Sequence, residues 1–312
     1  MKRIIAIILA LTLAMSLVAC GESSSGEVKE PTNVTTGNNT GNTEQEEPQE
    51  PQDGQAENTA DPEQTAITIN EAVLVDEAGV KITAKSLVVD EFFGTEIKLL
   101  IENNSGKDLT FQCRNVSVNG YMVEPMMSVD VANGKKANDS ITFMESDLES
   151  CGINAIADIE IAFHIFDMAE WEPYLDTDAI QIKTSIADTF EYTYDDSGDL
   201  VYEGNGVKIV LKGLAEDESF IGPSLVVYIE NLGDKNITVQ VRDVSINGFM
   251  VDSVFSCDVV AGKRAVDTIT FMESDLEENE ITAIEEIELY FHVFESDGWD
   301  TIVDTEIIKI TF

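Results

Sequence analysis

The chain has 312 residues, of which 43% are hydrophobic, and this length and composition suit about two globular domains. It carries 60 acidic and only 18 basic residues, a formal net charge of −42. Such a surface repels polyanions, which excludes DNA and RNA binding and leaves cations, basic proteins and neutral glycans as partner classes. The acidity is also consistent with a simple role in solubility.

The N-terminus carries two basic residues, Lys2 and Arg3, followed by an apolar run over residues 4–15 that is short for a membrane span. The run ends in Leu-Val-Ala-Cys, with Ala19 directly before Cys20. This order resembles a bacterial lipoprotein signal with its lipobox. The resemblance implies that residues 1–19 are a cleaved signal peptide, that Cys20 is the lipid attachment site, and that the protein is extracytoplasmic and membrane-anchored at the cell surface.

The segment over residues 20–66 has the composition of a tether. It contains four of the seven prolines, no aromatic residue and many Gly, Ser, Thr, Asn and Glu residues. Such a segment cannot bury enough apolar surface to offset the entropy of ordering it. We therefore expect a disordered acidic linker between the lipidated cysteine and the folded part.

The remaining chain contains two copies of one module. Residues 139–149 recur as residues 267–277 with one substitution, and Phe163-His-Ile-Phe166 recurs as Phe291-His-Val-Phe294. Both offsets are 128 residues. A repeat of this length indicates two similar domains, which we place at residues 67–187 and 196–312.

Both copies have the pattern of β-strands. Ile159, Ile161, Phe163 and Ile165 alternate with more polar residues, as expected for a strand with one face in a core. The Asn-Gly pairs at 119–120 and 247–248 predict tight hairpin turns, because both positions tolerate a positive φ. The sequence therefore predicts an all-β fold of two tandem immunoglobulin-like β-sandwich domains, without the Cys–Trp–Cys spacing of true immunoglobulin domains.

One short helix is expected in each copy. Ser146 and Glu149 match the capping-box spacing, as do Ser274 and Glu277 in the second copy. We expect the serine to cap the start of the helix. A leucine between them, Leu148 or Leu276, is expected to face the sandwich edge.

Two further motifs recur in both copies. Ile101-Glu102-Asn103 and Ile229-Glu230-Asn231 each precede an Asn-Gly hairpin. Together with the lipobox, this combination resembles secreted bacterial lipoproteins that carry immunoglobulin-like β-sandwich modules of uncharacterised function. The resemblance implies a surface location and a sandwich fold, and it supplies no catalytic residue.

Besides Cys20, the chain has three cysteines: Cys113, Cys151 and Cys257. An odd number cannot all pair within one chain. Cys113 aligns with Val241 and Cys257 with Val129, which favours a role as small core residues. A Cys113–Cys151 disulfide is the alternative.

The most polar candidate sites are the two loops that contain the tryptophans. Their candidate ligand residues are Trp171, Asp176, Asp178, Trp299, Asp300 and Asp304. Three interpretations remain open: carboxylates that coordinate Ca²⁺, a tryptophan that stacks on a sugar, and a tryptophan that plugs the end of the sandwich. His164 and His292 precede each tryptophan by seven residues. One histidine per module cannot form a two-His metal site, so we expect no resident metal.

Basic pairs follow a glycine at equivalent places in the two copies, Lys135-Lys136 and Lys263-Arg264. We expect them in exposed turns. A local contact with an acidic partner is the alternative.

No catalytic motif is present: the sequence lacks the nucleophile elbow, the phosphate-binding loop, the zinc-protease motif and the dinucleotide-binding glycine motif. We therefore predict a non-enzymatic protein with no cofactor, anchored to the membrane through Cys20. It would present two β-sandwich modules to an unidentified protein or envelope component. The alternatives are a glycan- or Ca²⁺-binding surface module and a passive structural spacer.

Overall fold

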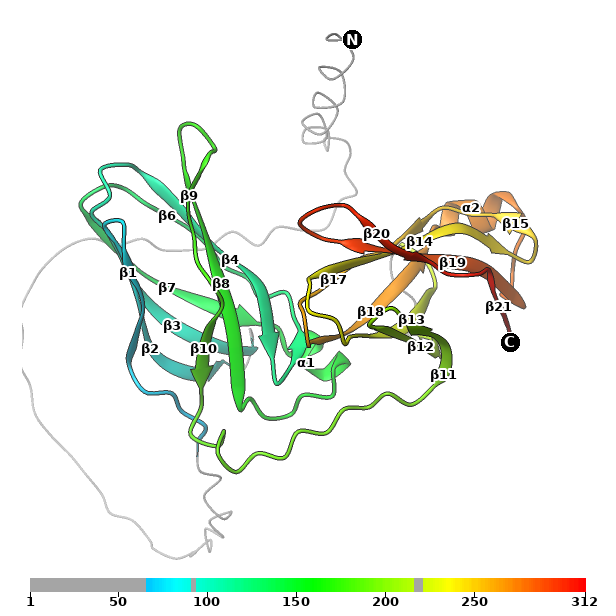
Figure 1. Ribbon diagram of the computed structural model, residues 1–312, viewed down its shortest axis with the longest axis horizontal. Helices are drawn as coiled ribbons and strands as arrows, with labels where there is room; N and C mark the ends of the chain where they lie inside the picture. The colour runs from blue at the N-terminus through cyan, green and yellow to red at the C-terminus, as the bar shows by residue number, and fades with distance from the viewer. Residues whose placement is uncertain (1–65, 91–93, 216–220) are drawn as a thin grey trace, which may run out of the picture. The chain divides into compact units, whose positions relative to one another are not determined.

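The computed structural model describes residues 66–90, 94–215 and 221–312. The predicted signal peptide, Cys20 and all of the predicted acidic linker except residue 66 lie outside these residues. The described part is built almost entirely from β-strands with two short helices, which confirms the predicted all-β sandwich class (Figure 1). The described residues all belong to one compact unit.

The first repeat consists of two facing sheets. One sheet has the strand order β1-β2-β3-β7, and the other contains β10, β8, β4 and β5, with β6 and β9 pairing at its side. The bounds are β1 (Ala72–Glu77), β2 (Val80–Asp90), β3 (Gly94–Asn103), β4 (Leu109–Val118), β5 (Tyr121–Met122), β6 (Ser128–Val131), β7 (Lys135–Phe143), α1 (Glu145–Ser150), β8 (Asp158–Asp167), β9 (Pro173–Asp176) and β10 (Ile180–Lys183).

The second repeat has the same arrangement. Strands β11, β12, β13, β16 and β18 form one layer, and β14, β15, β17, β19, β20 and β21 form the other. The first of these layers is continuous with the β10-β8-β4-β5 sheet of the first repeat, because β18 pairs with β5 in parallel. The bounds are β11 (Asp199–Gly204), β12 (Val207–Leu214), β13 (Ser224–Asn231), β14 (Ile237–Ile246), β15 (Phe249–Met250), β16 (Ser253–Val254), β17 (Ser256–Val259), β18 (Arg264–Phe271), α2 (Glu273–Glu278), β19 (Glu286–Glu295), β20 (Thr301–Asp304) and β21 (Ile308–Thr311).

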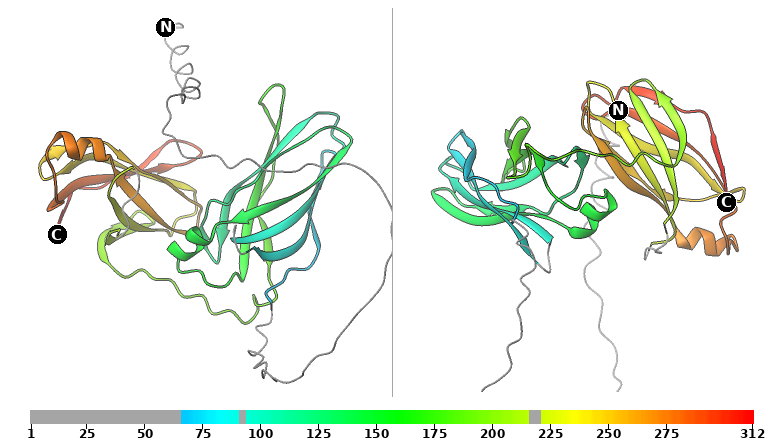
Figure 2. Two further views of the ribbon diagram at one scale, coloured as in Figure 1. Left: turned by 180° about the vertical axis from the view of Figure 1, so that it is seen from behind. Right: turned by 90° about the horizontal axis from the view of Figure 1, so that it is seen from below.

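Alternation of side chains fills the core of each repeat. In β8 the residues Ile159, Ile161, Phe163 and Ile165 are fully buried between the sheets. Their counterparts on β19 are buried to the same degree, and Figure 2 shows the two layers of each repeat from further directions. The period-two pattern therefore predicted correctly which face of these strands lies inside.

The predicted turns form as expected. Asn119 and Asn247 have φ angles of 51° and 52°, and each is followed by a glycine at 85°. The Asn119 side chain accepts hydrogen bonds from the backbone N–H groups of Ala157 and Asp158, at 2.9 and 3.1 Å. This asparagine therefore holds the turn against the start of β8.

The predicted helices are present, but the predicted cap is wrong. Helix α1 begins at Glu145, so Ser146 lies inside the first turn, and the N-cap residue Met144 makes no side-chain capping hydrogen bond. At α2 the N-cap residue is Met272, which also makes no side-chain capping hydrogen bond. Leu148 and Leu276 are buried as expected, so packing of the leucine holds each short helix rather than a capping box.

The expectation of an exposed basic turn is wrong for the second repeat. Lys263 pairs with Glu160 of the first repeat, and Arg264 pairs with Glu230 at 2.7 Å. The Arg264 guanidinium also lies 3.5 Å from the centre of the Tyr194 ring. In the first repeat, Lys136 pairs with Glu102 and stays largely exposed.

No helix in the described residues is long and apolar enough to cross a membrane.

Candidate functional site

Each tryptophan lies in the loop of a hairpin. In the first repeat the loop joins β8 to β9, and in the second it joins β19 to β20; both hairpins end in open loops in Figure 1. The backbone N–H of Trp171 donates a hydrogen bond to the Asp167 carbonyl at 2.8 Å, and this bond links the two ends of the loop. Trp299 donates in the same way to Glu295 at 2.9 Å. The two copies therefore build the same local structure from partly different residues.

Both tryptophans have an unusual backbone. Their φ angles are 56° and 59°, in the left-handed region that usually holds glycine or asparagine. For a bulky residue this conformation costs about 1–2 kcal/mol. The local chain must therefore offset that cost in both copies.

Each indole ring stacks on a phenylalanine of the preceding strand. Trp171 stacks on Phe166 with 5.6 Å between ring centres and 23° between planes, and Trp299 stacks on Phe294 at 5.4 Å and 13°. Each phenylalanine is buried, whereas each tryptophan is 76% exposed. The interpretation of the tryptophan as a plug of the sandwich end is therefore wrong, because a plug would be buried.

A histidine extends this row of rings. His164 lies 5.5 Å from Phe166, and its ring nitrogen Nδ1 donates to the Asp176 carboxylate at 2.6 Å. In the second repeat His292 makes the same 2.6 Å bond to Asp304. His164 and Asp176 are directly opposite each other on β8 and β9, which explains the pairing.

Arg114 adds a positive charge in the first repeat. Its guanidinium lies 2.7 Å from the Asp176 carboxylate. Burial is the largest influence on the pKa of Asp176 and raises it, but the hydrogen bond from His164 and the charge of Arg114 together bring that pKa below its ordinary value. The counterpart Arg242 bonds instead to Gln240, so the second site lacks this ion pair.

An acidic residue at the base of each loop holds it in place. The Asp167 carboxylate accepts hydrogen bonds from Lys107 at 2.6 Å and from the backbone N–H of Ala169 at 2.8 Å. Both hydrogen bonds lower the pKa of Asp167, and the bond from Lys107 has the larger effect. Glu295 takes the same place in the second repeat and pairs with Lys235. The loop shape therefore depends on a charged contact beneath it.

The structure separates the six predicted loop residues into two groups. All six are exposed, but Asp176 and Asp304 are hydrogen-bonded to the histidines, whereas Trp171, Asp178, Trp299 and Asp300 are not. Within the described residues, no group of three or more His, Cys, Asp or Glu side chains could hold a metal ion. The histidine–aspartate pairs could have been found from the sequence, since both copies share a spacing of 12 residues.

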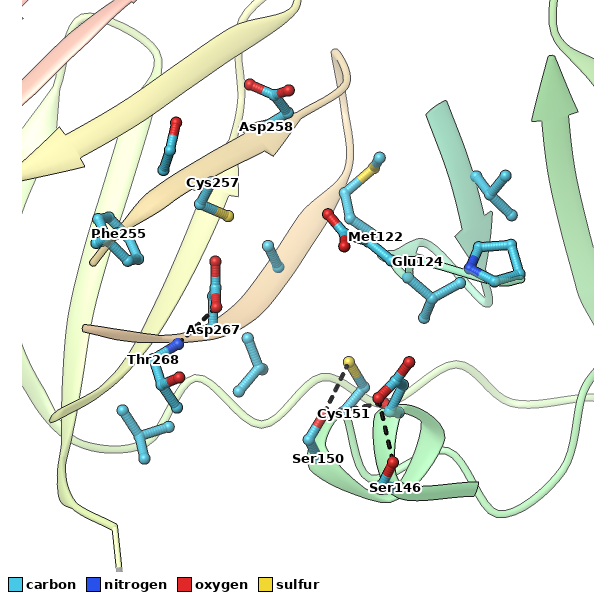
Figure 3. A pocket seen from close by; sticks show the side chains of 18 of the residues that line it. Met122, Glu124, Ser146, Ser150, Cys151, Phe255, Cys257, Asp258, Asp267 and Thr268 are labelled. Atoms are coloured by element: carbon cyan, nitrogen blue, oxygen red, sulfur yellow. Dashed lines mark hydrogen bonds between the residues drawn. The ribbon is translucent and has the colours of Figure 1, made fainter. Parts of the chain in front are cut away.

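A separate cavity of about 1180 Å³ is lined by the three described cysteines, Cys113, Cys151 and Cys257 (Figure 3). All three are free thiols, so the alternative of a Cys113–Cys151 disulfide is wrong for this structure. Burial raises the pKa of Cys113 to about 11 and raises the pKa of the other two thiols. Burial therefore favours the protonated form of these thiols, which is the less nucleophilic form.

Comparison with known proteins identifies no family for this chain. No protein-family model matches the chain, and no curated protein matches it. Among solved structures, the YadV chaperone has 9% identity and a TM-score of 0.22, with 70% of this chain and 92% of that chain covered. A red sea bream transglutaminase has 10% identity and a TM-score of 0.18, with 72% and 30% covered.

Proposed function

We propose that the protein is a lipid-anchored, extracytoplasmic, non-enzymatic binding protein. Cys20 would hold it to the membrane, the acidic linker would extend from there, and the two β-sandwich modules would contact a protein or envelope component through their tryptophan loops. The order of residues at the N-terminus supports the anchoring part of this proposal. More than one acyl chain on the cysteine would make that attachment stable.

The observation that carries the binding part is the exposure of Trp171 and Trp299. Each indole is 76% exposed and adopts a left-handed backbone. Neither feature helps the fold, because an exposed ring contributes little burial and the backbone conformation carries a cost. Their repetition in both modules supports a role in contact with another molecule.

Cross-linking on intact cells, followed by capture through a C-terminal tag and mass spectrometry, tests this function. We expect an enriched partner with the native chain. The variant Cys20→Ser should lose it through loss of anchoring, and the double variant Trp171→Ala/Trp299→Ala should lose it through loss of contact. A matched control is Phe249→Ala/Val254→Ala, which removes two other exposed apolar side chains, 48% and 57% exposed.

Two results would contradict the proposal. Normal membrane retention of Cys20→Ser would remove the anchoring part. Unchanged capture by the double tryptophan variant would remove the loops as the contact site. Thermal unfolding of each variant separates loss of binding from loss of folding, and we expect the tryptophan variants to remain folded because both rings are exposed.

A further inference from the structure

The segments that carry the two tryptophans are acidic, and the basic residues that pair with them, Lys107, Arg114 and Lys235, come from other strands and loops. Residues 167–178 contain five carboxylates and no basic residue, and residues 295–304 contain four carboxylates and no basic residue. Exposed indole rings therefore sit in strongly acidic loops in both modules. An anionic ligand would be repelled from both loops.

The carboxylates differ in whether they already have partners. Asp167 and Glu295, at the base of the loops, are each paired with a lysine. Glu172 and Asp300 directly follow the tryptophans and are exposed. Their side chains make no hydrogen bond or ion pair with the residues that the structure describes. Glu172 interacts electrostatically with Lys107 and Asp300 with Lys235, but both side chains are exposed and therefore accessible to a cation from outside.

The indole ring is the side chain that best attracts a cation to its face, and the attraction grows when a carboxylate lies beside it. Phe166 and Phe294 fix the rings in place, so little side-chain entropy is lost on binding. From these features we propose that the two tryptophan loops bind Arg- or Lys-rich segments of a basic partner protein. A neutral glycan could donate hydroxyl hydrogen bonds to the carboxylates, but it would gain no charge attraction from them. This inference rests on the proposed function and names the class of its partner.

Intrinsic fluorescence tests the proposal directly, because Trp171 and Trp299 are the two tryptophans of the chain. Hexaarginine titrated onto the whole chain should give a saturable fluorescence change, whereas a Gly-Ser hexapeptide should give none. The variant Trp171→Phe leaves the signal of the second loop alone, and Trp299→Phe that of the first. Each loop can therefore be measured by itself.

Charge-neutral variants separate the site from general attraction. Glu172→Gln/Asp300→Asn should weaken hexaarginine binding about fivefold or more, as expected from the loss of one charged contact beside the ring. The matched control is Glu145→Gln/Glu273→Gln, at the exposed first residues of α1 and α2. This control removes two negative charges, as the test variant does, but at helices that precede β8 and β19 instead of at the loops that follow these strands. Hexaarginine affinity should therefore stay within about twofold of that of the native chain.

Three results would overturn the inference: no saturable change with hexaarginine, equal weakening by both charge variants, or saturation by cellohexaose in place of hexaarginine. The last result would identify a glycan site at the same loops. The proposed function fails separately, through cell capture that does not depend on Trp171 and Trp299.

Discussion

At the residue scale, two asparagines show how a single side chain can hold a sandwich together. Asn103 is fully buried, and its amide donates to the carbonyl oxygens of Lys107 and Val131 at 2.8 and 2.7 Å. Asn231 makes the same two bonds in the second repeat. The repeated Ile-Glu-Asn motif is therefore explained by a buried amide that satisfies backbone groups of neighbouring loops.

The same scale explains a pH dependence at the first tryptophan hairpin. The pKa of Asp176 lies below its ordinary value in the folded state, despite the opposing effect of burial, because of His164 and Arg114. Its ionised form therefore stabilises the fold above the unfolded pKa near 3.8, and this contribution is lost as pH falls through the lower folded pKa.

We predict that Asp176→Asn lowers the free energy of unfolding at pH 6 and that the difference from the native chain shrinks steadily toward about pH 2. Urea unfolding at several pH values checks this. Asp178→Asn serves as the control, since its exposed side chain makes no hydrogen bond or ion pair in the described structure. A difference for Asp176→Asn that stays constant down to pH 2 would contradict the assignment.

At the scale of elements, a glycine stands at the entry to each of the corresponding strands β3 and β13: Gly94 begins β3, and Gly222 lies two residues before β13. A Cβ atom on Gly94 would lie 2.3 Å from the carbonyl oxygen of Phe143, and one on Gly222 would lie 2.0 Å from that of Phe271. Real Cβ atoms do not approach oxygen so closely. These strands can therefore pair with β7 and β18 only if a glycine stands at their entry.

We predict that Gly94→Ala destabilises the chain by more than about 3 kcal/mol, because the strand start must move away from β7. Gly106→Ala should cost only about 1–2 kcal/mol, since Gly106 also has a positive φ of 91° but has open space around it. Chemical unfolding of both variants gives the comparison. Equal losses would show that the backbone angle, not the close approach, decides the effect.

The elements that could be predicted from the sequence are those with a local pattern. The faces of β8 and β19 followed from alternation, and the Asn-Gly turns from two residues that accept a positive φ. The helix start could not be predicted in this way. The spacing of Ser146 fits a capping box, but the helix begins at Glu145, so Ser146 lies inside the first turn. Its hydroxyl donates a hydrogen bond to the Asp147 carboxylate at 3.2 Å instead.

At the scale of the whole molecule, the dominant feature is the excess of acidic over basic residues. A net charge of −42 places like charges close together in the compact state, which opposes folding. Part of this repulsion is offset by individual pairs such as Arg264–Glu230, whose two side chains are only 18% and 14% exposed. Most exposed carboxylates lack such a partner because the chain has few basic residues.

We predict that raising sodium chloride from about 10 mM to about 0.5 M raises the melting temperature of the chain, because the screening length falls from about 30 Å to a few ångströms. Differential scanning calorimetry measures this. Calcium chloride at matched ionic strength is the comparison, since an equal effect indicates screening and a larger one indicates ion binding. A fall in melting temperature with sodium chloride would contradict the dominance of repulsion.

The sequence by itself determined the repeat, the strand faces and the tight turns, because each depends on residues close together in the chain. The tertiary structure decided which candidate residues meet. It paired His164 with Asp176, stacked Trp171 on Phe166 without burying it, and enclosed Lys263 against Glu160. These contacts depend on how strands pair and how loops close, and no short periodic pattern in the sequence encodes that geometry.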